Sequence, residues 1–504
     1  MSVFVTSKAQ ATRHAVYAIE RTPPTSIRAT GTGTAVLIGQ FPWGPDSATD
    51  VIYEPSSTAD RNRTFAPPGM DHTGSAYLST LAKAYPRLLC VRVLGSTAAA
   101  ATANLQNVTP ATIVVATLKY KGTAGNAVAW TVSNASDGVA DHFNLRVSVT
   151  SASGTTEDFI QNLNYSGTGA DSVPDLTKTY LLGSISKSLS GRPLNGSGTF
   201  SGGVTGTINA ARYVGTAQTG DMGIAKCEGN KTIRHVFVDD PGNTDRAAVN
   251  AGLMAHAILM GDRTAYVNGN SGLSAAATLT DRANYSSDRV LYCDPWVYVR
   301  DDITQALRLV PPAPWVTSLN SQLSPSTSLA WKATEARNML SGIAGLEFDR
   351  GEAAATLSDA GVVVIIKEAN GGYACESDNT TVTLADPARR KNKRRKMVDY
   401  IGLSFVDSSR GSVDSPNVQQ NRDDLRVALD EFMSELKENA KKDANHLPHV
   451  VDYYIPPDES ANDLNSIAAG EYTLPLFVQL SSDMEKIFLS ITASEGAITV
   501  TESA

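Results

Sequence analysis

The side chains most able to perform chemistry are scattered along this chain. Of its seven histidines, only His235 and His256 fall in the central stretch of alternating helix and strand patterns. His235 begins a predicted strand and His256 lies on the apolar face of a predicted helix, so we interpret both as packing or surface residues. A Ser-His-Asp triad also needs a serine whose hydroxyl is exposed on a turn, and we find no Gly-x-Ser-x-Gly element. We therefore predict no catalytic residue and no cofactor.

One glycine-containing stretch, from Gly223 to Thr232, superficially resembles a phosphate-binding loop. A true P-loop has the spacing Gly-x-x-x-x-Gly-Lys-Ser/Thr, which points successive N–H groups at one phosphate. Here the two glycines are one residue too far apart, and Asn230 separates Gly229 from Lys231. The stretch therefore does not predict a nucleotide site.

The four cysteines, Cys90, Cys227, Cys293 and Cys375, lie far apart in the sequence. They form no Cys-x-x-Cys pair and have no histidine at ligand spacing, which argues against a zinc site. Thiols in a cytoplasm usually stay reduced. We interpret all four as reduced thiols in or near cores, and we predict no metal site.

The densest cluster of charge is basic and consists of Arg389, Arg390, Lys391, Lys393, Arg394, Arg395 and Lys396. Two interpretations remain open. The run can be the solvated edge of a hairpin, where charge deters edge-to-edge aggregation, or a patch that meets acidic residues of another subunit or partner. The formal net charge of the whole chain is −8, and this overall balance argues against sequence-independent binding of nucleic acid.

Length and composition indicate a large globular protein. The 504 residues exceed what one core holds, so we expect about three or four domains. Hydrophobic residues make up 42% and charged residues 19%, an ordinary globular balance. We find no run of about 18 apolar residues, so no membrane span is expected. The N-terminus lacks a basic segment followed by an apolar core, so we expect no secretory signal and folding in a cytoplasm.

The first half of the chain predicts mixed structure that is interrupted by a β-rich block. Strands are expected at 35–39 and 88–93, with a helix at 71–86 between them. From 96 to 215, short alternating segments such as 143–150 are separated by Gly, Asn and Ser. This pattern predicts an inserted β-sandwich, with residues 190–206 as a loop or loose hairpin.

The second half alternates strands and helices. Expected elements include strands at 236–238, 288–294 and 361–367, a helix at 245–260 and a partial helix at 329–341. Such alternation predicts a sheet with parallel strands. The strongest helix is 417–442, whose apolar positions recur at helical spacing, and strands follow at 450–455 and 472–480.

Both ends of the chain are predicted to be strands without local partners. The apolar positions of these two arms are Val3, Phe4, Val5, Ile487, Leu489 and Ile491. A lone strand exposes unpaired N–H and C=O groups. Adding it to the sheet of a neighbour supplies those bonds by β-augmentation.

Several motifs, in their order along the chain, resemble the contractile tail sheath family. They are Ile38-Gly39-Gln40-Phe41-Pro42-Trp43-Gly44-Pro45, the strand from Leu88 to Gly95, the glycine-rich segment 122–128, the stretch 359–381, and the C-terminal order of basic segment, Asn417, long helix, Tyr453, Asn462-Asp463, Gly470 and Pro475. The basic segment is expected to be a strand. Of the family's central motif only Trp331-Lys332-Ala333 remains clear.

The resemblance implies an α+β multi-domain fold: an N-terminal arm (1–25), the first part of an inner α/β region (26–95), a β-sandwich on the outer surface (96–215), a subtilisin-like α/β domain without its protease chemistry (216–385), an α/β C-terminal domain facing the tube (386–485) and a C-terminal arm (486–504). It also implies a virion-tail subunit, assembled in the host cytoplasm, that forms stacked hexameric rings around a tail tube. Its expected partners are further copies, the tube protein, and baseplate and terminator proteins.

For individual residues, the resemblance favours contact of the basic run, Glu431 and Glu435 with the tube or a neighbouring subunit, without direct contact to nucleic acid. Because a virion leaves the reducing cell, Cys227 and Cys375 become candidates for an intermolecular disulfide. Two alternative classes remain: a subtilisin-like hydrolase, which lacks the required Ser-His pair here, and a non-contractile β-rich surface or adhesin protein.

Overall fold

The computed structural model describes most of the chain, in two compact units formed by residues 30–401 and by residues 1–29 with 402–504. The described residues are 3–5, 17–19, 27, 31, 33–45, 64–65, 67, 69, 85–109, 111–140, 142–151, 154–164, 179–187, 189, 191–216, 222–300, 306–330, 339–369, 371–382, 386–413, 415–442 and 450–481.

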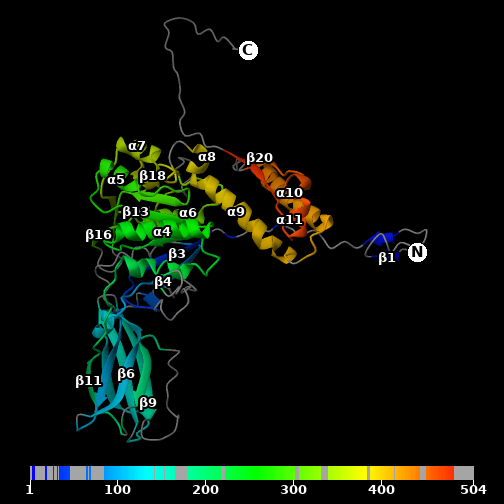
Figure 1. The fold of residues 1–504 in the computed structure, drawn as a ribbon. Coiled ribbons are helices and arrows are strands. Elements are labelled where there is room, and N and C mark those ends of the chain that lie inside the picture. Colours follow the sequence, from blue (N-terminus) through cyan, green and yellow to red (C-terminus); the bar gives the residue numbers. More distant parts are fainter. Residues whose placement is uncertain are drawn as a thin grey trace, which may run out of the picture. The chain divides into compact units, whose positions relative to one another are not determined.

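A seven-stranded sheet forms the centre of the larger unit (Figure 1). In spatial order its strands are β19 (Tyr373–Cys375), β18 (Val362–Lys367), β14 (Val290–Asp294), β13 (Thr264–Asn268), β12 (His235–Val238), β3 (Thr34–Gly39) and β4 (Arg87–Arg92). Neighbouring strands are parallel except for β18 and β19. The predicted mixed α/β architecture with parallel strands is confirmed.

Helices cover both faces of this sheet because its strands are apolar on both sides. On one face, Phe237 of β12 packs in a core with Trp315 of α6 (Ala313–Gln322). On the other face, Val236 packs with Leu253 of α4 (Arg246–Met260). The second face also receives α3 (Ala210–Val214), α5 (Ala275–Arg282) and α7 (Ala353–Asp359).

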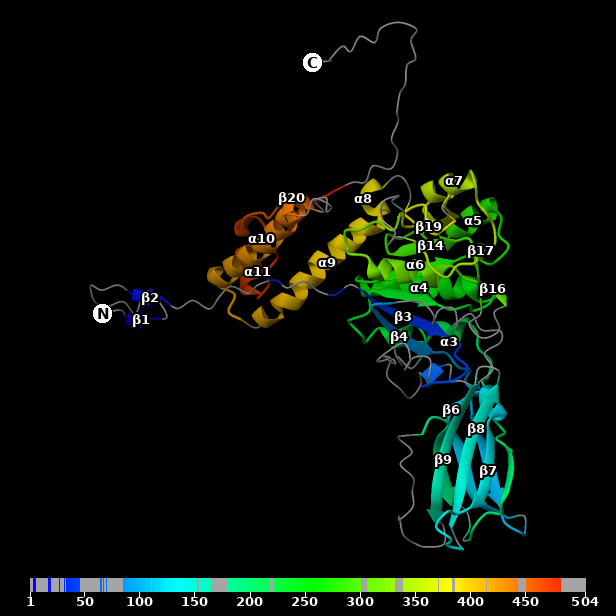
Figure 2. The same ribbon diagram turned by 180° about the vertical axis from the view of Figure 1, so that it is seen from behind.

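Two antiparallel sheets lie between β4 and β12 in the sequence and share one apolar core. The first has the order β10-β6-β5, with β5 (Ala100–Gln106), β6 (Thr112–Lys121) and β10 (Leu182–Lys187). The second has the order β11-β7-β8-β9, with β7 (Ala129–Asn134), β8 (His142–Ser151), β9 (Gly154–Asn164) and β11 (Gly196–Thr199). Figure 2 shows β7, β8 and β9 side by side. The predicted sandwich is present, although β11 is a strand where a loop or loose hairpin was expected.

Arg92 joins this sandwich to the parallel sheet. The residue is 1% exposed, and its guanidinium donates to the carbonyls of Phe41, Pro42 and Gly44 at 2.7–2.9 Å, and to that of Lys121 at 2.7 Å. A buried guanidinium must satisfy its donors, and here the turn after β3 and the end of β6 do so. Two of the motifs that carry the family resemblance, 38–45 and 88–95, thus meet at one side chain.

The chain enters and leaves the sandwich at adjacent points. The Gly95 amide donates to the Thr205 carbonyl at 2.9 Å. Gly206 has φ +74°, and a Cβ there would lie 2.9 Å from the Gly95 Cα. This close crossing requires glycine, because any side chain would push the two connecting segments apart.

Asp239 lies at the carboxyl end of β12 and is buried. Its carboxylate accepts hydrogen bonds from the Tyr213 hydroxyl and the Gln40 amide, both at 2.6 Å. Burial is the main cause that raises the pKa of Asp239 to about 7. The buried group therefore binds its proton more tightly in the folded than in the unfolded chain.

We expect the contribution of Asp239 to the free energy of unfolding to fall as pH rises from about 4 to about 7, because the raised pKa of Asp239 makes ionisation cost more in the folded state. The stability that Asp239 contributes is fully present below its pKa in the unfolded chain. It is lost as pH rises through its pKa in the folded chain. In urea unfolding across this window, the stability of the wild type relative to Asp239→Asn should fall as pH rises. Equal slopes would contradict the assignment.

The second unit contains the C-terminal helix and strands. It holds α10 (Gln419–Lys442), β20 (Val450–Tyr454), α11 (Leu464–Ala468) and β21 (Phe477–Leu480). The predicted long helix and both C-terminal strands are confirmed. A further helix, α9 (Asn392–Ser409), begins in the larger unit and ends in this one. The division into six segments predicted from the sequence stays a prediction.

Two other expectations differ from the structure or lie outside it. The basic segment, expected as a strand or hairpin edge, forms α8 (Pro387–Arg390) and the start of α9. That prediction is wrong because buried partners, described below, hold its charges on helices. The helix expected at 71–86 falls almost entirely outside the described residues, as do positions 331–338 of the partial helix at 329–341.

Candidate assembly interface

The small sheet of the C-terminal unit has edges that can accept another strand. Among the residues that the structure describes, β20 pairs only with β21, antiparallel, from Val450↔Leu480 to Tyr454↔Phe477. A two-stranded sheet is marginal by itself, and within the described part of the chain each of its strands has one edge without a ladder partner. The arrangement is therefore suited to β-augmentation.

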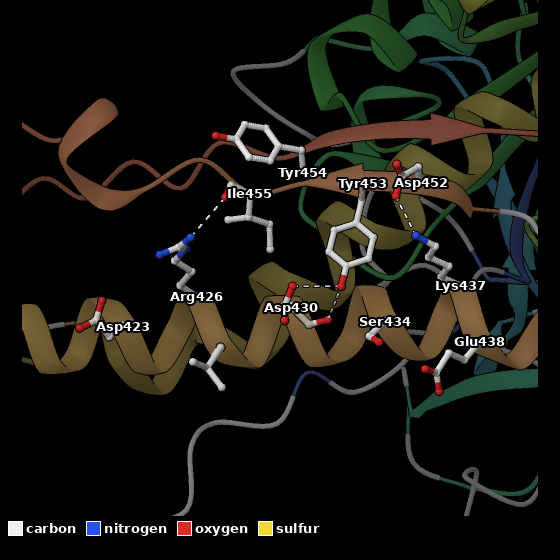
Figure 3. Close-up of a pocket in the computed structure, with 11 residues that line it drawn as sticks. Asp423, Arg426, Asp430, Ser434, Lys437, Glu438, Asp452, Tyr453, Tyr454 and Ile455 are labelled. Atoms are coloured by element: carbon white, nitrogen blue, oxygen red, sulfur yellow. Dashed lines mark hydrogen bonds and ion pairs between the residues drawn. The ribbon is translucent and has the colours of Figure 1, made fainter.

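One face of this sheet is closed by α10. Val450 and Ile455 are buried, as are Phe432 and Met433 of the helix, and α10 packs on β20. The Tyr453 hydroxyl donates toward Asp430, lying 3.1 Å from its carbonyl oxygen and 3.0 Å from its Oδ1 atom (Figure 3). These contacts fix the orientation of β20 relative to the helix.

The opposite face carries exposed aromatic rings. Successive side chains of a strand point to opposite faces, so Tyr454 points away from α10 while Tyr453 points toward it. Tyr454 is 58% exposed and its register partner Phe477 is 63% exposed. Their rings are stacked, with centroids 6.3 Å apart and an interplanar angle of 27°. Large exposed apolar groups of this kind are typical of contact surfaces.

A groove of about 720 Å³ runs between α10 and β20. Its charged lining residues are Asp423, Arg426, Asp430, Lys437, Glu438 and Asp452. Lys437 Nζ lies 2.7 Å from Asp452 Oδ1, and this hydrogen bond is the main cause that lowers the pKa of Asp452. The acids outnumber the bases, so the groove is suited to basic rather than acidic groups.

The basic run is largely turned inward. Arg390, Lys393 and Lys396 are each 7–8% exposed. The prediction that the basic run contacts another chain is wrong for these three residues, because they are buried within the larger unit. For Arg389, Lys391, Arg394 and Arg395 it stays a prediction.

Internal partners explain this burial. The Lys396 ammonium donates to Asn320 Oδ1 at 2.8 Å, and the nearby charge of Asp378 partly offsets the burial that lowers the pKa of Lys396 to about 8. Arg395 pairs with Asp399 at 2.6 Å, and Asp399 pairs in turn with Arg289 at 2.8 Å. The run therefore anchors α9 to the unit that contains the parallel sheet.

The remaining predicted site residues lie in different places. Glu431 and Glu435 are on the exposed side of α10, and their contact with a tube stays a prediction. The strand β1 (Val3–Val5) pairs in parallel with β2 (Tyr17–Ile19). The expectation that the N-terminal strand has no local partner is therefore wrong. Ile487, Leu489 and Ile491 lie outside the described residues.

Cys227 and Cys375 are both 0% exposed, and burial raises the pKa of each thiol to about 12. An intermolecular disulfide needs an accessible thiol, so this prediction is wrong for the folded subunit. Polar flanking residues suggested exposure, but each side chain packs in one of the two cores of the parallel sheet.

The two histidines of the central stretch have structural partners. His235 Nδ1 lies 2.8 Å from the Tyr266 hydroxyl, and His256 Nε2 lies 2.7 Å from Arg263 Nη1. Burial and the Arg263 charge lower the pKa of His256 to about 4. Within the described ranges no group of three or more His, Cys, Asp or Glu is placed to hold a metal ion. No helix in the described part of the chain is long and apolar enough to cross a bilayer.

Sequence reasoning did not identify Tyr454 and Phe477 as contact residues. The register of β20 shifts between Val450 and Asp452, and this irregularity interrupts the alternation that would have marked one face as exposed. The stretch Val450-Val451-Asp452-Tyr453-Tyr454 therefore gave no period-2 signal.

Comparison of the fold with solved structures gives a consistent result. The chain is similar to a sheath tail protein from Desulfitobacterium hafniense, with a TM-score of 0.61 and 15% identity over 88% of this chain and 94% of that chain. It is also similar to a chain of the anti-feeding prophage helical sheath in its contracted state, with a TM-score of 0.53 and 15% identity over 96% of this chain and 99% of that one.

A chain in the anti-feeding prophage baseplate structure gives a TM-score of 0.52 at 13% identity, over 96% and 99% of the two chains. No family model matches the sequence, and no curated protein matches it significantly. The chain therefore has the fold of contractile sheath proteins, which confirms the fold-level resemblance inferred from the motifs.

Proposed function

We propose that this protein is a non-enzymatic, structural sheath subunit of a contractile tail or injection system. The observation that carries the proposal is the match of nearly the whole chain, 96% of its length, to 99% of a contracted sheath chain. A match over full length in both chains covers the sandwich, the α/β core and the C-terminal unit together. Such agreement favours a sheath over a hydrolase that would share only the α/β core.

In the proposed assembly, copies form stacked hexameric rings around a tail tube, in contact with baseplate and terminator proteins. The sheath is assembled in an extended state within the host cytoplasm and contracts to drive the tube through the host envelope, for genome ejection in a phage. Energy would be stored in contacts between copies that differ between two packings. The seven-stranded sheet supports a subtilisin-like topology for the middle domain.

The proposed contacts between copies use the open edges of β20 and β21. The arms at 1–25 and 486–504 would add strands there, so that subunits remain joined while the lattice changes. The exposed rings of Tyr454 and Phe477 would be covered by this contact. The sandwich would lie on the outer surface, and Glu431 and Glu435 would face the tube.

Negative-stain microscopy of the purified protein over a range of concentration and salt tests the proposal. Long striated tubes or hollow cylinders are expected. Monodisperse particles under all conditions would overturn it and favour a non-contractile surface protein. Hydrolysis of peptide or ester substrates would instead support the hydrolase alternative.

A further inference from the structure

The groove between α10 and β20 follows one side of the helix. The residues that α10 contributes to its lining recur every three or four positions: Asp423, Arg426, Val427, Asp430, Ser434, Lys437 and Glu438. Such spacing places them in a row along the helix. Figure 3 shows Asp423 and Glu438 near the two ends of this row. They are 15 residues apart in the sequence, so at about 1.5 Å per residue the row is roughly 22 Å long.

The two bases of the groove already have partners. Lys437 pairs with Asp452, and Arg426 donates to the Ile455 carbonyl at 3.4 Å. Among the groove residues drawn in Figure 3, Asp423 and Glu438 make no hydrogen bond or ion pair with one another or with the rest. The other lining residues therefore leave negative charge uncompensated toward both ends of the groove, where a basic side chain would be attracted.

The middle of the groove is aromatic. Tyr453 and Tyr454 both contribute to the lining, and the Tyr453 hydroxyl is held by Asp430, which lies midway along the row. Grooves lined by aromatic rings bind proline-containing segments in the polyproline conformation, because that conformation costs little entropy to hold. The lining is therefore suited to an extended segment with prolines in its middle and a base toward each end.

A segment near the N-terminus has this composition. It reads Arg21-Thr22-Pro23-Pro24-Thr25-Ser26-Ile27-Arg28 and contains no acidic residue. Of these eight positions only Ile27 is among the described residues. Proline fixes φ and keeps the residue before it extended. At about 3.1 Å per residue in the polyproline conformation, Arg21 and Arg28 are expected roughly 22 Å apart, which matches the length of the row.

Charge also distinguishes between the two ends of the chain. Residues 1–29 contain four basic residues and one acidic residue, Glu20. Residues 482–504 contain four acidic residues and one basic residue, Lys486. A groove with an excess of acids attracts the first of these ends and repels the second.

We propose that the groove between α10 and β20 binds residues 21–28 of a second copy of this chain. Arg21 and Arg28 pair with Asp423 and Glu438, and the two prolines pack on the tyrosines. That the segment comes from another copy rests on the proposed function as an assembling subunit. The contact is distinct from strand addition at the edges of the sheet, because proline lacks the amide that a β-ladder requires.

Fluorescence anisotropy with a labelled peptide of residues 18–31 tests this contact. The receptor is the full chain with Arg21→Ser and Arg28→Ser, so that its own segment does not compete, at a concentration where sedimentation shows single copies. Saturable binding is expected, and it should weaken as salt is raised because salt screens the ion pairs. Asp423→Asn and Glu438→Gln should each weaken it about two- to fivefold, the effect of losing one exposed ion pair.

Glu431→Gln in the same receptor is the matched control. Glu431 is exposed on the same helix but does not line the groove, and the substitution removes the same charge. It should leave the affinity unchanged. A peptide with Pro23→Ala and Pro24→Ala should bind more weakly, because it loses more conformational freedom on binding.

Absence of saturable binding would overturn the proposal. Equal affinity for a scrambled peptide, or an equal loss in Glu431→Gln, would also overturn it by showing attraction without a fitted site. Equal binding of a peptide of residues 484–504 would show that the groove takes the other end of the chain. Tube formation by the wild type is measured separately. Tubes without peptide binding would reject this contact alone, whereas peptide binding without tubes would support the contact and reject the sheath.

Discussion

Deletion of residues 2–20 is expected to abolish the formation of tubes or cylinders while leaving the larger unit folded. The deleted arm contains the β1–β2 pair, and a parallel pair of three-residue strands is too small to be stable alone. Such a segment gains most from joining another sheet, and the parallel sheet of residues 30–401 does not include it. Negative-stain microscopy and sedimentation at matched concentration measure the loss.

Removal of the sandwich is the matched control. Because Gly95 and Thr205 are hydrogen-bonded neighbours, residues 96–205 can be replaced by a short Gly/Ser linker without separating the strands of the parallel sheet. Trp43, which packs in the sandwich core, should be changed to serine in that variant. Assembly should survive this larger deletion better than the loss of the arm. Normal tubes without residues 2–20 would show that the arm does not join subunits.

Asp378→Ala should lower the free energy of unfolding of the larger unit by about 3–5 kcal/mol, the usual cost of leaving a buried charge without its compensating partner. Asp378 is 0% exposed and accepts hydrogen bonds from the Leu329 amide, the Asn392 side chain and the Lys393 amide. Its removal leaves these donors unsatisfied and the charge of Lys396 buried without compensation. The change is measured from urea unfolding midpoints of this unit.

Two comparisons isolate the cause of this loss. Lys437→Ala removes a pair whose partners are 39% and 64% exposed, so it should cost far less than Asp378→Ala because solvent screens such a pair. Adding Lys396→Met to Asp378→Ala should recover part of the stability, because no buried charge then remains. Loss of the Asp378 charge should lower the folded pKa of Lys396 further below its wild-type value of about 8, so the loss in Asp378→Ala should shrink as pH rises toward about 8, above which Lys396 is neutral in both folded proteins. A cost no larger than that of Lys437→Ala would contradict the role of Asp378 in compensating the buried charge of Lys396.

Much of the fold could be predicted because local sequence patterns agree with the final structure. The run Val362–Lys367 is apolar and β-branched, and a strand buried on both faces needs that composition. The helix at Gln419–Lys442 repeats its apolar residues at helical spacing, which is sufficient for an amphipathic helix on a sheet. Alternation along His142–Ser151 likewise identified a half-buried strand.

The site was harder to predict because its features depend on partners distant in sequence. Seven basic residues between 389 and 396 indicate a solvated surface unless Asn320, Asp378 and Asp288 are known to meet members of the run. Burial of Cys227 and Cys375 depends on cores assembled from distant strands and helices. In both cases charge or polarity of neighbours in the sequence was a poor guide to neighbours in space.

The inward-facing charges also affect the colloidal behaviour of the protein. Among the described residues, buried side chains include more cations than acids: Arg92, Arg234, Arg246, Arg263, Arg282, Arg390, Lys393, Lys396 and Arg422 against Asp158, Asp239, Asp288, Asp294 and Asp378. The exposed side chains of the described residues are thus more negative in sum than all the described side chains together, and the formal net charge of the whole chain is −8. Copies therefore repel one another over a range set by the Debye length, about 10 Å at 0.1 M salt. Ionic strength then determines how closely free copies approach before short-range contacts can form.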